Sequence, residues 1–302
     1  MKVTGNLSAV WLGLCAIGIA AVAGAQEPGK EKPVTVTLKA GDLTCVLGDH
    51  RDHGAGKTGY IGIHQLTHTD EPESPFVPRY AGIIVSRSEA QVKQIAEREG
   101  EILHLSNGKE THRMRFTLVP PDAIDVTIIV PAGPSGGFIN SCCYMNGPED
   151  PGIYFVDPKG NWQWHYDPVH GNAASVFPDG MPLPILQRVP NATYKHGTNS
   201  FADSVSEWRY DPKLAFYYGL FKKMVFIQMF PPNCAVVPYM SPSGGGTHPT
   251  GCKNPAWDWR IRISKDQIVD NKATLRLRIV YKPFVSQQDV LNEYDRWCKT
   301  PK

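Results

Sequence analysis

Histidines gather in one stretch of the chain. His50, His53, His64 and His68 place four of the ten histidines within 19 residues, beside the acidic run at 70–73. Imidazole titrates near neutral pH and a carboxylate can fix its tautomer, so these residue types can act as general acid and base. We therefore predict catalytic roles for His53, His64 and His68. Two alternatives stay open: the histidines satisfy loop backbone groups, or His64 and His68, four residues apart, share one side of a helix or strand and bind a metal ion.

A second cluster is aromatic and spans residues 162–167, which read Trp-Gln-Trp-His-Tyr-Asp. In a strand, Trp162 and Trp164 lie on one face, and Gln163, His165 and Asp167 lie on the other. Exposed indoles can stack on sugar rings while the polar side chains bind hydroxyl groups, whereas a buried aromatic face would be core packing. We predict that these residues bind substrate, with His165 as a further acid or base.

A glycine-rich segment at 241–257 holds two more binding candidates, His248 and Trp257. Three consecutive glycines are typical of a linker, but long loops within a compact domain often contact ligands. A glycoside hydrolase also needs two suitably spaced carboxylates. The carboxylates available near these motifs are Glu73, Asp150, Asp167 and Asp258.

The first 25 residues are typical of a secretory signal peptide. Lys2 precedes an apolar run at 9–22, and Ala23-Gly24-Ala25 fits a cleavage site. An uncleaved anchor helix is the alternative, although the run is short for a bilayer. We expect a linker at 26–33, a single domain at 34–302, a secreted or periplasmic location, and no integral membrane segment after cleavage.

Export makes disulfides plausible among the six remaining cysteines. We favour a bond between Cys234 and Cys252, which would close a loop rich in glycine and proline. The chain contains no Cys-x-x-Cys spacing of the kind that zinc sites use.

Charge and composition exclude several classes of protein. The 302 residues carry a formal net charge of only +2, which argues against a nucleic-acid partner. Gly56-Lys57-Thr58 lacks the earlier glycine of a phosphate-binding loop, so we predict no nucleotide partner. No metal or other cofactor is predicted. The 28 glycines and 26 prolines disfavour a helical bundle and favour a turn-rich β protein.

Alternating apolar and polar residues predict many strands. The clearest runs are 34–38, 112–119, 124–130, 152–156, 224–230, 257–263 and 273–281, with hairpin turns at 107–108 and 157–160. In the last run, leucines and an isoleucine at 275, 277 and 279 alternate with Arg276 and Arg278, which is typical of a sheet with one wet face. We predict an all-β, mainly antiparallel fold: a large β-sandwich with long loops.

Two helices complete the predicted fold. Ser88 and Gln91 fit a capping box for a short internal helix that ends near Gly100. Ser286 precedes a C-terminal helix whose apolar face includes Val290 and Tyr294. Neither helix carries an evident site.

Several motifs together resemble a group of exported bacterial proteins that are common in planctomycete-like, polysaccharide-degrading bacteria. The resemblance covers most of the mature chain, apart from residues 86–101. It rests on the segments 53–56, 64–68 with 73–78, 144–150 with 153–155, and 241–246 with 254–258. It implies a β-sandwich that handles glycans, and it brings no catalytic residues to this chain.

The sequence therefore predicts an exported carbohydrate-active protein. The leading hypothesis is an enzyme that uses histidine acid-base chemistry on a glycan, with lyase, epimerase and hydrolase reactions all left open. The first alternative is a non-catalytic glycan-binding or structural domain. The second is a metal-dependent hydrolase.

Overall fold

The structure is a computed structural model that describes residues 34–50, 60–77, 80–85, 89–131, 137–166, 175–181, 208–242 and 255–300. The predicted signal peptide and linker lie outside these residues, as do His53, Asp167, His248 and Cys252. Within the described part, no helix is both long enough and apolar enough to span a membrane.

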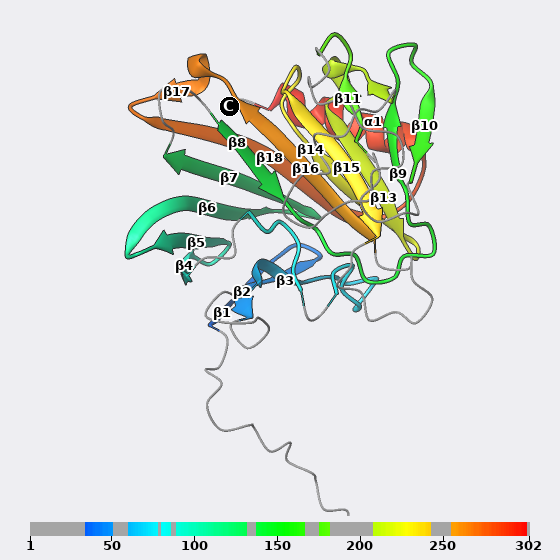
Figure 1. The fold of residues 1–302 in the computed structure, drawn as a ribbon. Coiled ribbons are helices and arrows are strands. Elements are labelled where there is room, and N and C mark those ends of the chain that lie inside the picture. Colours follow the sequence, from blue (N-terminus) through cyan, green and yellow to red (C-terminus); the bar gives the residue numbers. More distant parts are fainter. Residues whose placement is uncertain are drawn as a thin grey trace, which may run out of the picture. The chain divides into compact units, whose positions relative to one another are not determined.

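The larger layer is a ten-stranded antiparallel sheet (Figure 1). In spatial order its strands are β10 (Trp162–His165), β9 (Ile153–Val156), β13 (Phe216–Phe221), β14 (Met224–Met229), β18 (Lys272–Pro283), β7 (Ala123–Pro131), β6 (Lys109–Val119), β5 (Glu99–Ser106) and β4 (Glu89–Ala96), with β17 (Ile268–Val269) paired to β18. The turns predicted at 107–108 and 157–160 join β5 to β6 and β9 to β10.

The second layer combines two three-stranded sheets. One contains β1 (Thr35–Ala40), β2 (Leu43–His50) and β3 (Tyr60–His68), and the other contains β15 (Val236–Pro242), β16 (Pro255–Ile263) and β8 (Gly137–Ser141). Isolated bridges connect them through the segments 82–84 and 142–144. A short parallel pair, β11 (Phe177–Pro178) and β12 (Arg209–Tyr210), forms a two-stranded sheet of its own. These layers confirm the predicted all-β, mainly antiparallel sandwich.

The main core lies between the two layers. Leu275, Leu277 and Ile279 of β18 point into it, as their alternation with arginines predicts. From the other layer, the buried Trp257 packs so closely that a Cβ on Gly219 would lie 2.2 Å from its ring. Only glycine fits there, because a side chain would overlap the indole.

A helix covers part of the opposite, outer face of the large sheet. This helix, α1 (Gln287–Lys299), begins at Ser286, whose side chain accepts a hydrogen bond from the backbone N–H of Asp289. Its buried residues Val290 and Tyr294 join a second apolar cluster with residues of β13, β14 and β18. The C-terminal helix is therefore confirmed. Two single 3-10 turns, η2 (Pro212–Leu214) and η3 (Lys265–Gln267), complete the described elements.

The internal helix predicted after Ser88 is wrong, because residues 89–96 form the edge strand β4. The strand pairs with β5 over most of its length and buries Ala90 in the main core. Gly100 does not end a helix but lies in β5, where a Cβ would be 2.5 Å from Leu47 Cδ1. Strand pairing and burial here outweigh the helical preference of the local sequence.

The predicted disulfide between Cys234 and Cys252 is also wrong, because the Cys234 thiol is free. Burial raises the pKa of this thiol to about 12. A thiol that stays protonated is a poor nucleophile, so Cys234 acts as a small apolar residue.

Candidate functional site

His64 and His68 lie on opposite faces of β3. A β-bulge at His64 interrupts the pairing with β2, because Val46 pairs with Gln65 while Leu47 pairs with Ile63. The His64 ring approaches Gly48 on one face and its Nε2 lies 3.0 Å from the Tyr60 carbonyl oxygen. The bulge resets the alternation that would have put both histidines on the same side.

His68 belongs to the core side of β3. Its ring centroid lies 6.5 Å from that of the buried Tyr281, and its Nδ1 accepts a hydrogen bond from the Asp70 N–H at 3.0 Å. Only 6% of His68 is exposed. It therefore closes a turn at the end of β3 rather than facing an open cleft.

His165 lies on a different sheet. Its ring is tilted over that of Trp208, with centroids 4.7 Å apart, and its exposed fraction is 9%. Figure 1 shows β10, which carries His165, well separated from β3. Within the described residues, no group of three His, Cys, Asp or Glu side chains is arranged to hold a metal ion. The predicted histidines that the structure describes, His64, His68 and His165, thus form no shared acid-base site.

Trp164 is the most exposed of the predicted binding residues that the structure describes. Its exposed fraction is 44%, yet its indole Nε1 donates a hydrogen bond to Asp150 Oδ1 at 2.8 Å. Asp150 also accepts from the Tyr154 hydroxyl at 2.7 Å and from the Gly152 N–H at 3.2 Å. A Cβ on Gly152 would lie 2.4 Å from the indole, so the ring rests directly on the backbone. An exposed aromatic ring is thereby fixed in one orientation.

Hydrogen bonding and burial act together on the pKa of Tyr154. Burial is the largest cause of a raised pKa, and the hydrogen bond to the Asp150 carboxylate adds to it. The Tyr154 hydroxyl therefore stays protonated as a donor. Its ring stacks on that of Tyr218, with centroids 4.9 Å apart. This stacking holds in place the Tyr154 hydroxyl that donates to Asp150.

Trp162 shares the outer face of β10 with Trp164 but is half-buried. Its ring meets those of Phe216 and Tyr218 edge-on, with centroids at 6.0 and 5.7 Å. It packs against the apolar cluster beneath α1. The predicted alternation of faces is correct, and within it Trp162 supports the sheet while Trp164 remains accessible.

Gln163 lies on the other face of β10, and its amide nitrogen donates to Asp157 Oδ2 at 2.9 Å. Asp157 organises the β9–β10 turn by accepting from the N–H groups of Lys159 and Asn161 at 2.9 and 2.8 Å. The Asn161 N–H is the main cause that lowers the Asp157 pKa. Gln163 is thus tied to the turn through its amide nitrogen.

Trp257 is fully buried, which argues against its predicted role as a binding surface. Its Nε1 donates to the Pro151 carbonyl oxygen at 2.9 Å, and its own carbonyl oxygen accepts from the Tyr217 hydroxyl at 3.1 Å. The ring stacks on Phe226 in the core. Both faces of β16 are covered here, so alternation in the sequence could not distinguish a core tryptophan from an exposed one.

The carboxylates considered for hydrolysis have separate partners. Lys222 lies 2.6 Å from Glu73. The buried Asp258 accepts from the Cys143 N–H at 2.8 Å. Asp150 holds Trp164, as described above. Each of the three that the structure describes therefore has a local structural contact of its own, while Asp167 lies outside the described residues.

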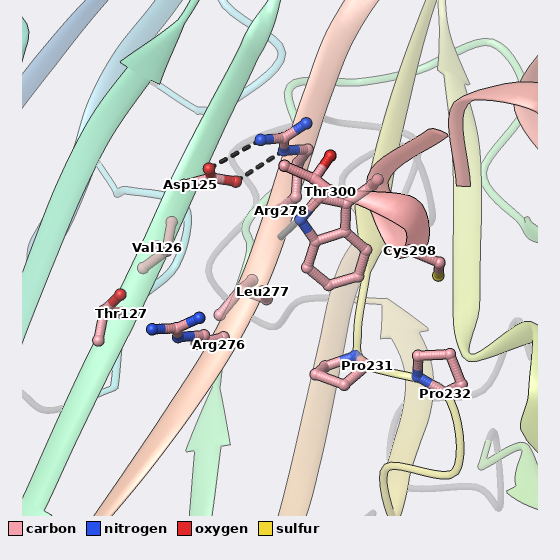
Figure 2. A pocket seen from close by; sticks show the side chains of 11 residues that line it. Asp125, Val126, Thr127, Pro231, Pro232, Arg276, Leu277, Arg278, Cys298 and Thr300 are labelled. Atoms are coloured by element: carbon pink, nitrogen blue, oxygen red, sulfur yellow. Dashed lines mark hydrogen bonds and ion pairs between the residues drawn. The ribbon is translucent and has the colours of Figure 1, made fainter. Parts of the chain in front are cut away.

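Sequence reasoning missed a pocket of about 440 Å³ on the outer face, at the end of α1. Figure 2 shows residues of β7 and β18 on one side, with Pro231, Pro232 and the end of α1 on the other. Trp297 also lines it. Nothing in the local sequence marks Trp297 as a pocket residue, and the wet-face arginines of β18 are the signal that points here.

Comparison with known proteins gives little further guidance. No family model matches the chain, and no curated protein matches it. Among solved structures, a protein titled HI1317 aligns with a TM-score of 0.43 and 10% identity, over 83% of this chain and 93% of that one. A chain of an endoplasmic reticulum glucosidase II complex aligns with a TM-score of 0.31 and 8% identity, over 87% of this chain and 30% of that one. Likeness at this level carries no function over to this protein.

Proposed function

We propose that the protein is an exported carbohydrate-binding protein that holds a sugar ring against Trp164. The observation that carries this proposal is the exposed but immobilised indole, with its N–H bound to Asp150 and its ring resting on Gly152. The export part rests on the signal-like sequence at 1–25.

The flat face of an indole offers an apolar surface to the C–H groups of a sugar ring. A ring that is already fixed loses little conformational freedom on binding, which favours affinity. Six large apolar residues of the described part are notably exposed, and only Trp164 and Trp208 of these are aromatic. Single exposed apolar residues are normal, so the fixed orientation of the Trp164 ring, more than its exposure, supports a binding role.

β10 is the edge strand of its sheet in the described part of the protein, so Trp164 lies at the border of the outer face. Trp164 serves the outer face. Gln163, His165 and the partly exposed Trp208 belong to the other face. Trp208 therefore lies apart from the Trp164 face, to which the proposed sugar site belongs.

Binding without turnover is the form of the proposal that the described residues favour. The enzyme hypothesis needs an acid and a base in one place, but His64 and His68 face opposite sides of β3 and His165 lies on another sheet. A catalytic site would therefore need a candidate that the structure does not describe, such as His53.

Isothermal titration of the whole protein with a panel of neutral oligosaccharides tests the proposal. We expect Trp164→Ala to weaken binding about tenfold or more, the size expected for losing one aromatic stacking partner. Trp208→Ala is the matched control, because it removes the other exposed tryptophan from the opposite face. Binding that survives Trp164→Ala but is lost in Trp208→Ala would place the site on the wrong face.

A further inference from the structure

The pocket at the end of α1 has a charge that the described residues do not neutralise. Arg278 forms two hydrogen bonds with Asp125, Nε to Oδ1 at 2.6 Å and Nη2 to Oδ2 at 2.7 Å (Figure 2). Arg276 is exposed and makes no ion pair or hydrogen bond with any residue that the structure describes. One guanidinium in the pocket is thus fixed and compensated, and its neighbour is available.

The sequence of β18 explains why both arginines face the pocket. Leu275, Leu277 and Ile279 occupy the core side, so the residues between them must point outward. Two like charges two residues apart on one face repel each other, and Asp125 compensates only one of them. An anion beside Arg276 would relieve this imbalance.

Positive charge continues across the sheet from Arg276. Residues directly opposite one another on β18, β7, β6, β5 and β4 form a row, listed here in that order: Arg276, Thr127, Arg115, Glu101 and Lys93. Neighbouring strands are about 4.8 Å apart, so successive cations in this row are about 10 Å apart. Lys93 and Arg115 share the buried Glu101, at 3.0 and 3.4 Å.

The remaining walls suit a sugar. Trp297, Pro231 and Pro232 supply flat apolar surfaces, and Thr127 and Thr300 supply hydroxyl groups. The volume falls within the usual range for small-ligand sites, about 300–1,000 Å³. Apolar surface, hydroxyl groups and one available guanidinium together fit a sugar that carries a negative group.

We propose that this pocket binds an acidic sugar residue of a polyanionic glycan, with Arg276 contacting its carboxylate or sulfate group and Trp297 facing its ring. The row of cations toward β4 contacts further acidic groups along the same glycan chain. This inference rests on the proposed carbohydrate binding and names a second site, separated from Trp164 by the strands that α1 covers.

Three polymers with one backbone test the proposal: neutral dextran, carboxymethyl dextran and dextran sulfate, each titrated into the intact protein. We expect at least one charged polymer to bind, with affinity that falls as salt is added, and dextran to bind more weakly. Which charged polymer binds more tightly decides between carboxylate and sulfate. Arg276→Gln should weaken that binding about tenfold, the size expected for one charge-assisted hydrogen bond.

Arg262→Gln is the matched control, because Arg262 is an exposed arginine on β16 in the other layer. It should change the affinity for the charged polymer little. Equal losses in Arg276→Gln and Arg262→Gln, or equal binding of dextran and its charged forms, would overturn the proposal. The salt-dependent difference between the charged polymer and dextran reports on this pocket, whereas binding of neutral oligosaccharides reports on Trp164, so failure here and failure of the Trp164 proposal are distinguishable.

Discussion

His104 and His112 face each other across β5 and β6 inside the sandwich, with ring centroids 6.1 Å apart and planes nearly perpendicular. His104 is fully buried, and neither of its ring nitrogens has a hydrogen-bond partner in the described part of the protein. Burial, followed by repulsion from His112, lowers the pKa of His104 to about 4. The fold therefore holds a neutral imidazole where charge is strongly disfavoured.

Stability should fall in mild acid for this reason. An unfolded histidine has a pKa of about 6.5, so between about pH 6.5 and pH 4 the unfolded chain binds a proton that folded His104 does not. The contribution of neutral His104 to the free energy of unfolding is complete above about pH 6.5. It decreases as pH falls, by at most about 1.4 kcal/mol per pH unit. Urea unfolding at pH 7 and pH 5 measures this loss.

His104→Leu should flatten the dependence on pH over that range. Ile102→Val is the control, since Ile102 lies two residues earlier and is also buried in the core. It should cost about 1 kcal/mol equally at both values of pH. If the free energy of unfolding falls by the same amount between pH 7 and pH 5 in wild type and His104→Leu, the assignment to His104 is contradicted.

Tyr294 anchors α1 to the sheet through its hydroxyl group. The hydroxyl accepts from the Ala215 N–H at 3.1 Å and donates to the Phe230 carbonyl oxygen at 3.0 Å. Tyr294→Phe leaves both backbone groups buried without this partner, so we expect a loss of about 1–3 kcal/mol in unfolding free energy. Tyr80→Phe, at a half-buried position, should change stability by much less. Chemical denaturation compares the two variants.

Gly152 gives a way to move Trp164 without removing it. An alanine Cβ there would lie 2.4 Å from the indole, so the ring must leave its present position. We expect Gly152→Ala to weaken binding of neutral oligosaccharides and to shift tryptophan fluorescence, while the cooperative unfolding transition persists. Lys159→Ala, in the exposed turn of the same hairpin, should leave both signals unchanged. Unaltered affinity in Gly152→Ala would show that the ring position does not matter.

Asp150 should control the same site through hydrogen bonding. Asp150→Ala removes the acceptor of Trp164, Tyr154 and the Gly152 N–H, and we expect a stability loss of about 1–3 kcal/mol together with weaker sugar binding. Asp150→Asn keeps one acceptor oxygen and should fall between wild type and Asp150→Ala. Titration calorimetry and urea unfolding on the three proteins give this order, and an equal effect of both variants would contradict it.

Much of the fold follows from local patterns in the sequence. The alternation in β18 and the cap at Ser286 each depend only on residues close in sequence. A single sequence is therefore enough to predict both. β4 is the exception, because its residues favour a helix and only the pairing with β5 makes it a strand. Tertiary contacts of this kind leave no local signal.

The site was harder to predict because its contacts join distant residues. Asp150 and Trp164 are 14 residues apart and meet only once the β9–β10 hairpin has formed. The pocket brings Asp125, Arg276 and Trp297 together from three separate elements. The bulge at His64 likewise depends on pairing with β2, so sequence spacing wrongly grouped that histidine with its neighbour four residues on.

The most direct test of sugar binding at Trp164 follows the indole N–H signals of the protein in a nitrogen-15 NMR spectrum during titration with a neutral oligosaccharide. Substitution of single tryptophans by phenylalanine assigns the signals of Trp164 and Trp208. We predict a saturable shift of the Trp164 signal, while the buried Trp257 signal stays in place. A sugar that binds and shifts the Trp208 signal while leaving that of Trp164 unmoved would contradict it.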